Sequence, residues 1–403
     1  MFKIKITQLL ILLSLLPIFL NIYFQVYGSF EEYNLIYQKV FINIGAIIFV
    51  LLFLFNFNQI KKLYFFNIFL ITNIFLLIIY LIIYQELTSK YILFFAQILI
   101  PWSAFFFGLT YKINDEDIKK IFIFNFILIL SLLINSFIQK QLYLSPNFYF
   151  FQIYQIYQYV PNTLVLIFFF SFLLMDFKKN NLVKLFFLTS ILIFSLMSNS
   201  LSLIFITCLF FSWFILIDKK KINYKKIIFI CILFILICSF VFILITFIEK
   251  ISQPAYDKTF YDWGRYSKFI DLLNLQLPEN IYYRIEIYKN FLQELKNLQI
   301  FFIGSNNLDL IDAYKSAHNI ILNIIFFKGI FFLLLYLYPF KIFLTPFIKK
   351  IPIEFTIYLL FLLLIISAEN MFKVSIQQPY SGCVTMFILG LLKNNYEFFK
   401  SKF

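Results

Sequence analysis

The chain has 403 residues, of which 62% are hydrophobic and 13% charged, and apolar runs of about 20 residues recur from end to end. This composition is typical of a helical protein that crosses a membrane many times, and it excludes a soluble globular domain. The net charge of +14 does not predict a nucleic-acid partner. The basic residues form short clusters between apolar runs, where they set the orientation of a membrane protein.

Twelve apolar runs predict an all-α, polytopic membrane protein with about twelve transmembrane helices. The first run follows Lys3 and Lys5 but lacks the small-residue cleavage site of a signal peptide, so we interpret it as a span. Residues 185–217 would form one helix of about 50 Å, too long for a hydrocarbon layer of about 30 Å, so SNSLS at 198–202 is predicted to be a turn. The predicted spans are residues 6–24, 39–57, 64–84, 91–111, 121–137, 160–175, 185–199, 201–217, 227–247, 319–340, 353–370 and 380–393.

The lysine distribution predicts which ends of the spans face the cytoplasm. If the N-terminus is inside, the inner segments hold 21 of the 34 basic residues, as the positive-inside rule requires. A single helix over 185–217 would instead place the five lysines of DKKKINYKK outside, so we reject it. The predicted inner segments are residues 1–6, 58–63, 112–120, 176–184, 218–226, 341–350 and 393–403.

One long hydrophilic segment, residues 248–317, divides the chain into nine N-terminal helices in 1–247 and three C-terminal helices in 318–403. It is predicted to face the outside, and its 8 basic and 9 acidic residues differ from the basic inner loops. Within it, an amphipathic helix is predicted with an apolar stripe formed by Ile281, Ile285, Tyr288, Leu292 and Leu295.

The four cysteines are interpreted as small core residues, because they lie in apolar spans or at their ends. Neither a disulfide framework nor a metal site is predicted for Cys208, Cys231, Cys238 and Cys383.

The two arginines and the single histidine are the candidate functional residues. Only Arg265 and Arg284 are arginine among 34 basic residues, and both lie in the outer loop. If the two arginines were placed at random among the 34 basic positions, both would lie in this loop in about 5% of cases. The planar guanidinium fork of arginine binds phosphate better than the ammonium of lysine does. His318, where this loop meets the next span, is the only imidazole. Taken one at a time, Arg284 is explained as a salt-bridged surface residue, Arg265 as an interfacial anchor and His318 as a helix cap, and only the grouping favours catalysis.

Polar residues in this part of the chain also occur in a recognisable order. Arg284 begins a helix of about 15 residues, IFFIGSNN with Gly304 follows, and SAHNIILNIIFFKGI opens the next span with His318, Asn319, Leu322 and Gly329. This order resembles the O-antigen ligase and O-antigen polymerase superfamily, whose members have a long outer loop with an arginine, a "plfGxG" stretch and H-N-x-x-L followed by a glycine. The motifs cover about residues 280–330, and the span count extends the similarity to the whole chain.

The resemblance implies a glycosyltransferase of surface polysaccharide or lipopolysaccharide biosynthesis, in the cytoplasmic membrane of a bacterium with its site facing outward. Its donor would be a polyprenyl-diphosphate-linked glycan and its acceptor a sugar hydroxyl on another glycan, with membrane lipids and other polysaccharide-assembly proteins as neighbours. His318 would be the base and Arg284 would stabilise the diphosphate, with Arg265, Asn319 and Gly304 contacting substrate. Transfer would invert the anomeric carbon without a metal or other cofactor.

Three departures from the family pattern stand out. SNN follows Gly304 where a second glycine is expected, and Lys328 replaces a common acid. Asn199 stands where many relatives have an arginine, so Arg265 is expected to supply that phosphate contact.

Two other functions remain open at this point. A metal-dependent glycosyltransferase acting on lipid-linked sugars would use a carboxylate pair such as Glu31 and Glu32 in the first outer loop. A polysaccharide transporter or flippase would require buried ionisable residues and broken helices, which Lys328 suggests. The sequence does not separate polymerase from ligase.

Overall fold

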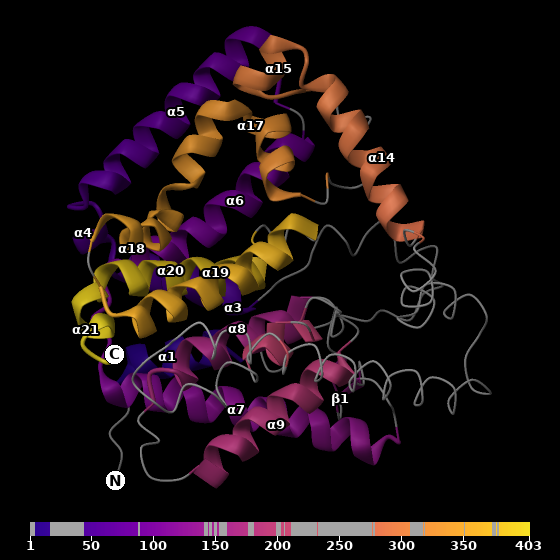
Figure 1. Cartoon of the computed structure of the whole chain (residues 1–403). Coiled ribbons are helices and arrows are strands. Elements are labelled where there is room, and N and C mark those ends of the chain that lie inside the picture. Colours follow the sequence, from indigo (N-terminus) through magenta and orange to yellow (C-terminus); the bar gives the residue numbers. More distant parts are fainter. Residues whose placement is uncertain are drawn as a thin grey trace.

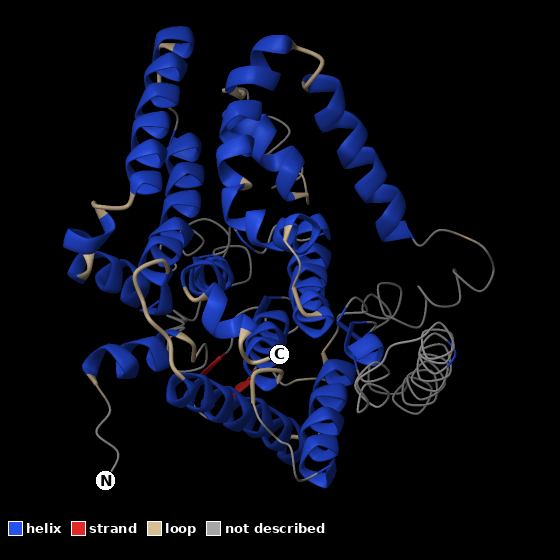
Figure 2. Ribbon diagram, turned by 60° about the vertical axis from the view of Figure 1, so that its left-hand side comes forward, coloured by secondary structure: helices blue, strands red, loops and turns tan. Residues whose placement is uncertain are grey.

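The computed structural model describes residues 5–16, 44–87, 89–140, 144, 147–148, 151–152, 159–175, 181–198, 203–204, 206–210, 232, 276, 279–306, 317, 319–349, 351–372, 376 and 379–403. Within these residues the regular secondary structure is helical except for one two-residue pair of antiparallel strands, Asn147–Phe148 (β1) and Phe151–Gln152 (β2), as Figure 2 shows. The predicted all-α class is confirmed.

The helices follow one another in the order drawn in Figure 1. They are α1 (Ile6–Ser14), α3 (Ile44–Phe55), α4 (Phe57–Ile60), α5 (Tyr64–Tyr84), α6 (Ser89–Gly108), α7 (Asp115–Ile138), α8 (Tyr159–Phe172), α9 (Asn181–Met197), α14 (Glu279–Glu294), α15 (Leu298–Ile303), α17 (Ile320–Tyr336), η4 (Tyr338–Leu344, a 3₁₀ helix), α18 (Thr345–Ile348), α19 (Ile353–Phe372), α20 (Pro379–Asn394) and α21 (Tyr396–Lys400).

By length and composition, α5 and α7 can each cross a membrane, and the bent pair of α17 with residues 338–348 would make a third span. On α5 the exposed side chains include Ile71, Ile74, Phe75, Ile78 and Ile82, which suits contact with lipid. Shorter apolar helices occur at most of the other predicted spans that fall within the described residues. A count of twelve spans stays a prediction.

Two central helices, α8 and α20, are buried almost all round. Residues 160–172 are buried without exception, and so are residues 380–392. The crossing of α6 and α20 depends on glycine, because a Cβ at Gly108 would lie 2.7 Å from the carbonyl oxygen of Phe387. Close backbone approach at small residues is a common way for helices to associate in membranes.

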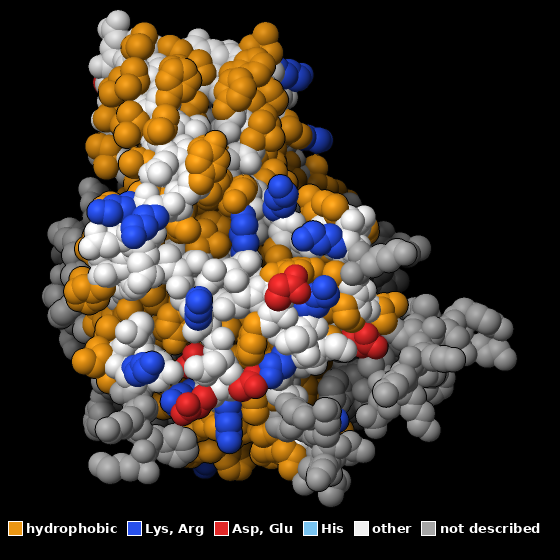
Figure 3. Space-filling model, turned by 90° about the vertical axis from the view of Figure 1, so that its left-hand side faces the viewer, with side chains coloured by type: hydrophobic (Ala, Val, Ile, Leu, Met, Phe, Trp, Pro, Cys, Tyr) orange, Lys and Arg blue, Asp and Glu red, His pale blue; other side chains and the backbone are white. Residues whose placement is uncertain are grey.

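Segments predicted to share the inner side lie together at one face, which we call the lysine-rich face. In Figure 1, α4, α18, α21 and the C-terminus gather at the left-hand side, and Figure 3, which looks onto this face, shows lysine side chains scattered over it. Lys402 pairs with Asp115, and the Asn395 amide donates to the Tyr111 carbonyl at 2.9 Å. The prediction of one common face is therefore consistent with the fold, while the compartment that this face meets stays a prediction.

Candidate functional site

Arg284 lies on the inward-facing side of α14. Ile287 and Phe291, one and two turns further on, are fully buried, and Arg284 itself is half-buried. Burial lowers the pKa of the Arg284 guanidinium from its ordinary value, and the nearby Tyr288 phenol opposes this shift. The group stays charged near neutral pH, because an arginine pKa starts above 12.

The predicted apolar stripe of this helix is wrong in part: Tyr288 and Leu295 pack against the core, but the centre of the packed side lies elsewhere. Ile285 and Leu292 are exposed, whereas Ile287 and Phe291 make the contact with the rest of the protein. The segment carries apolar residues on both sides, so hydrophobic periodicity alone could not select the packed side. The correction matters because it turns Arg284 toward the protein.

The second half of α14 packs against the first part of α17. The rings of Phe291 and Phe326 lie 4.8 Å apart, and α14 and the part of α17 before Gly329 both run toward α15, as Figure 1 shows. Seven residues before each ring, about 10 Å back along each axis, stand Arg284 on α14 and Asn319 on α17. The two helices diverge toward these ends, as Figure 1 shows, so the ring contact does not fix the distance between Arg284 and Asn319.

Asn319 caps α17. Its side-chain oxygen accepts hydrogen bonds from the backbone N–H groups of Ile321 at 3.0 Å and Leu322 at 3.2 Å. The buried Ala317 donates its N–H to the Asn323 side chain at 3.0 Å, so the backbone is fixed on both sides of position 318. The capping role explains why position 319 is asparagine. The predicted contact of Asn319 with substrate stays a prediction. His318 and Arg265 lie outside the described residues.

Gly304, which follows α15, and Gly329, at a break in α17, allow the backbones of these two helices to pack closely. Both glycines have positive φ, 98° and 77°, and Gly329 interrupts the helix between Ile320 and Tyr336. A Cβ at Gly304 would lie 2.7 Å from the Lys328 nitrogen, and one at Gly329 would lie 2.6 Å from the Ile303 nitrogen. This packing explains why Gly304 is glycine. It also places Gly304 about 13 Å along α17 from Asn319, so the structure does not bring these two predicted substrate contacts together.

Hydrogen bonds complete this glycine junction, the name we give to Gly304, Ser305 and Gly329 with the backbone they touch. The Ser305 N–H donates to the Phe326 carbonyl at 2.7 Å. The Tyr84 hydroxyl, from the last turn of α5, donates to the Gly304 carbonyl at 2.6 Å. The junction thus joins α5, α15 and α17, and Ser305, the residue directly after Gly304, takes part in it.

Lys328 is buried beside the glycine junction. Its side chain is 4% exposed, and its ammonium lies 3.6 Å from the centre of the Tyr91 ring and 4.1 Å from that of Phe95. No carboxylate of the described residues lies within 4 Å of it. Tyr91 stacks on Tyr80 at 3.9 Å, so the aromatic contacts continue toward α5.

The neighbours of Lys328 offset only part of the cost of burying it. Removing an ammonium from water costs several kcal/mol in a real protein. Each cation–π contact contributes about 1–2 kcal/mol when desolvated. The Lys328 ammonium also lies at the C-terminal end of the part of α17 before Gly329, and its interaction with the helix dipole contributes about 0.5–1 kcal/mol. Burial of the Lys328 side chain is therefore not a source of stability.

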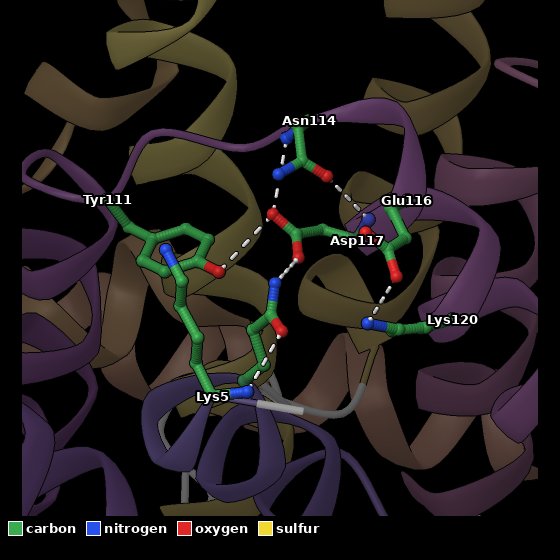
Figure 4. Close-up of polar contacts among 7 residues, drawn as sticks. Lys5, Tyr111, Asn114, Glu116, Asp117 and Lys120 are labelled. Carbon is green, nitrogen blue, oxygen red and sulfur yellow. Dashed lines mark hydrogen bonds and ion pairs between the residues drawn. The ribbon is translucent and has the colours of Figure 1, made fainter. Parts of the chain in front are cut away.

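A polar cluster at the lysine-rich face was missed by the sequence reasoning. The buried Asp117 carboxylate accepts hydrogen bonds from the Gln8 amide, the Tyr111 hydroxyl at 3.3 Å and the Asn114 N–H at 3.2 Å, as Figure 4 shows. The Asn114 side chain in turn accepts from the Asp117 N–H at 2.9 Å. Burial and the Asp117 charge both raise the pKa of Tyr111.

This cluster joins α1 to the start of α7 and has a structural role. Asn114 is an N-cap followed by acidic residues at 115–117, a pattern that favours helix initiation and was readable from the sequence.

The described residues contain no group of three histidine, cysteine or acidic side chains arranged to hold a metal ion. The predicted alternative ligands Glu31 and Glu32, like Asn199, lie outside the described residues.

Comparisons with known families, curated proteins and solved structures found no match to this chain.

Proposed function

We propose that the chain is a membrane glycosyltransferase that moves a glycan from a polyprenyl diphosphate carrier to a sugar hydroxyl at the outer leaflet of a bacterial cytoplasmic membrane. One observation supports this proposal: α14, which carries the inward-facing Arg284, packs on α17, whose N-cap Asn319 is the neighbour of the only histidine. A cation and an imidazole would then border the same space beside the start of α17.

The proposed reaction needs those two groups. The acceptor oxygen forms a bond to the anomeric carbon, whose bond to the diphosphate oxygen breaks, and the electron pair leaves with the diphosphate. His318 takes the acceptor proton, a task suited to a group with an unperturbed pKa of about 6.5. Arg284, with Arg265, stabilises the charge that grows on the leaving diphosphate. Inversion follows from a single displacement, and no metal or other cofactor is needed in this scheme.

Reconstitution tests the proposal directly. The purified protein in liposomes, given a fluorescent polyprenyl-diphosphate oligosaccharide and a glycan acceptor, should lengthen the acceptor and release polyprenyl diphosphate. No transfer with a range of donors and acceptors, in protein shown to be folded, would contradict it.

Polymerase and ligase activities differ in the acceptor, so a gene deletion separates them. Loss of a polymerase should leave a core that carries one repeat unit, whereas loss of a ligase should leave bare core and lipid-linked polymer. An unchanged surface polysaccharide would contradict both.

A second function, transport of a lipid-linked glycan, is favoured by Lys328 and the break in α17. A buried cation next to a helix break is typical of substrate sites in transporters. The test is movement of a fluorescent lipid-linked glycan between leaflets of proteoliposomes without acceptor. If Lys328 carries this movement, the Lys328→Met variant should abolish it, and movement at the wild-type rate in that variant would contradict this role.

A further inference from the structure

Three large apolar side chains form an exposed patch around α15. Leu298 is 69% exposed, and Phe302, one helical turn further on, is 39% exposed. Phe331 of α17 is 53% exposed, and its ring stacks on that of Phe302 at 5.6 Å. We call these three residues the α15 patch. Lys296, which precedes α15 by two residues, is also exposed.

Helix α15 lies one membrane crossing away from the lysine-rich face. Helix α5 begins at that face, shortly after Lys62, and its 21 residues extend about 32 Å, close to the 30 Å or so of a hydrocarbon layer. At the far end of α5, the Tyr84 hydroxyl donates to the Gly304 carbonyl, directly after α15. The polar Gln85 and Glu86 that follow are exposed. With α5 across the membrane, α15 therefore lies where the hydrocarbon ends on the opposite side.

The α15 patch also continues a surface that suits lipid. Helix α15 packs on α5, on which Ile78 is 50% exposed and Ile82 is 70% exposed. Hydrophobic side chains cover most of the upper part of the molecule in Figure 3, where α5 and α15 lie in Figure 1. Burying such a side chain completely contributes about 1.5–3 kcal/mol, so an apolar covering is favoured over water.

Lys296 indicates that lipid, and not a second protein surface, provides this covering. Lysine is depleted in the cores of protein interfaces. At a membrane surface, in contrast, the lysine stem lies along apolar groups while its ammonium reaches the phosphates. A cation that borders exposed apolar and aromatic side chains is therefore typical of the headgroup layer.

We propose that the α15 patch is embedded in the headgroup region of the leaflet opposite to the lysine-rich face. Leu298, Phe302 and Phe331 contact the upper part of the acyl chains, and the Lys296 ammonium donates to a lipid phosphate. The segment 248–317, whose hydrophilic sequence predicts an outer loop, is then anchored to the membrane through α15. This contact holds the adjoining end of α14, the helix of Arg284, at the membrane surface.

Spin labelling of the full chain in nanodiscs of phosphatidylglycerol and phosphatidylethanolamine tests the contact. Collisions of a nitroxide with oxygen, which concentrates in lipid, and with a water-soluble nickel chelate report its depth. At Leu298→Cys the nitroxide should lie about 5–10 Å below the phosphates, the depth of the apolar face of an interfacial helix. Ile78→Cys on α5 is the lipid reference. Glu286→Cys, exposed on α14 and remote from the patch, is the matched control and should report water.

Only the introduced cysteine should carry the label. Cys208 and Cys383 are buried, and Cys231 and Cys238 are changed to alanine in every variant. Adding Lys296→Glu to the labelled protein should move the nitroxide toward water, because a carboxylate is repelled by lipid phosphates.

Two results would overturn the proposal. One is a nitroxide at Leu298→Cys that meets the nickel chelate as often as the one at Glu286→Cys does. The other is protection from both reagents with dipolar broadening that disappears on dilution with unlabelled protein, which would assign the patch to a second copy of the chain. Phe331→Cys gives an independent reading on α17 if Leu298→Cys fails to fold. None of these results depends on whether the protein transfers glycans.

Discussion

Replacing Gly329 by alanine tests the glycine junction. The φ of 77° disfavours any L side chain by about 1–2 kcal/mol. The new Cβ would also lie 2.6 Å from the Ile303 nitrogen, so α15 would have to move by about 1 Å, a distortion that costs about 1–3 kcal/mol. That movement would strain the hydrogen bond from Ser305 to Phe326, which contributes about 1 kcal/mol.

The three effects together predict a loss of about 3–6 kcal/mol, seen as a melting temperature lower by about 5 °C in detergent. Gly304→Ala acts on the same junction, so the double variant should lose less than the sum of the two single losses. Lys289→Ala, on the exposed side of α14, serves as control and should melt like the wild type. A Gly329→Ala protein that melts within about 1 °C of the wild type would refute this description of the junction.

Three other substitutions give separate expectations. Asn319→Ala removes the cap of α17 and should cost about 1 kcal/mol of unfolding free energy, measured by thermal melting; an unchanged melting temperature would contradict the capping role. Lys328→Met replaces a buried charge by an apolar chain of similar shape, so stability should stay equal or rise, and a marked loss would show that the ammonium has a partner that stabilises it. Asp117→Ala leaves three donors without their acceptor and should cost about 2–4 kcal/mol, whereas Glu116→Ala, which loses only a surface pair with Lys120, should cost less than about 1 kcal/mol.

Apolar length and charge distribution predicted much of the fold. The span predicted at residues 64–84 coincides with α5, and the one predicted at 353–370 corresponds to α19, Ile353–Phe372. Long apolar runs allow this because the hydrocarbon core offers the backbone no hydrogen-bond partners, so its N–H and C=O groups must pair within a helix.

Hydropathy did not predict the features of the fold that depend on helix capping and on contacts between backbone segments. Helix α7 begins at Asp115 and not near residue 121, because the Asn114 cap adds polar residues that hydropathy assigns to a loop. The break at Gly329 lies inside the span predicted at residues 319–340, and its contact with the α15 backbone explains it. Hydropathy carries no information on such contacts between distant segments.

The candidate site was predicted less completely than the fold. Arg284 was selected because arginine is rare here, and composition alone could not reveal that Phe291 packs on Phe326 and turns Arg284 inward. Asn319 was selected from a motif, and its capping role follows from the backbone at the start of α17. The tyrosines around Lys328 come from α5 and α6, more than 230 residues away in the sequence.

The most direct test of the central claim is the rate of glycan transfer by three variants in liposomes. Arg284→Lys should lower the single-turnover rate by about 10²–10³, because a lysine does not reproduce the guanidinium fork, and His318→Ala should lower it by about 10²–10⁴. Lys289→Ala, which removes a cation from the exposed side of the same helix, should transfer at the wild-type rate. Wild-type rates in both Arg284→Lys and His318→Ala would contradict the account.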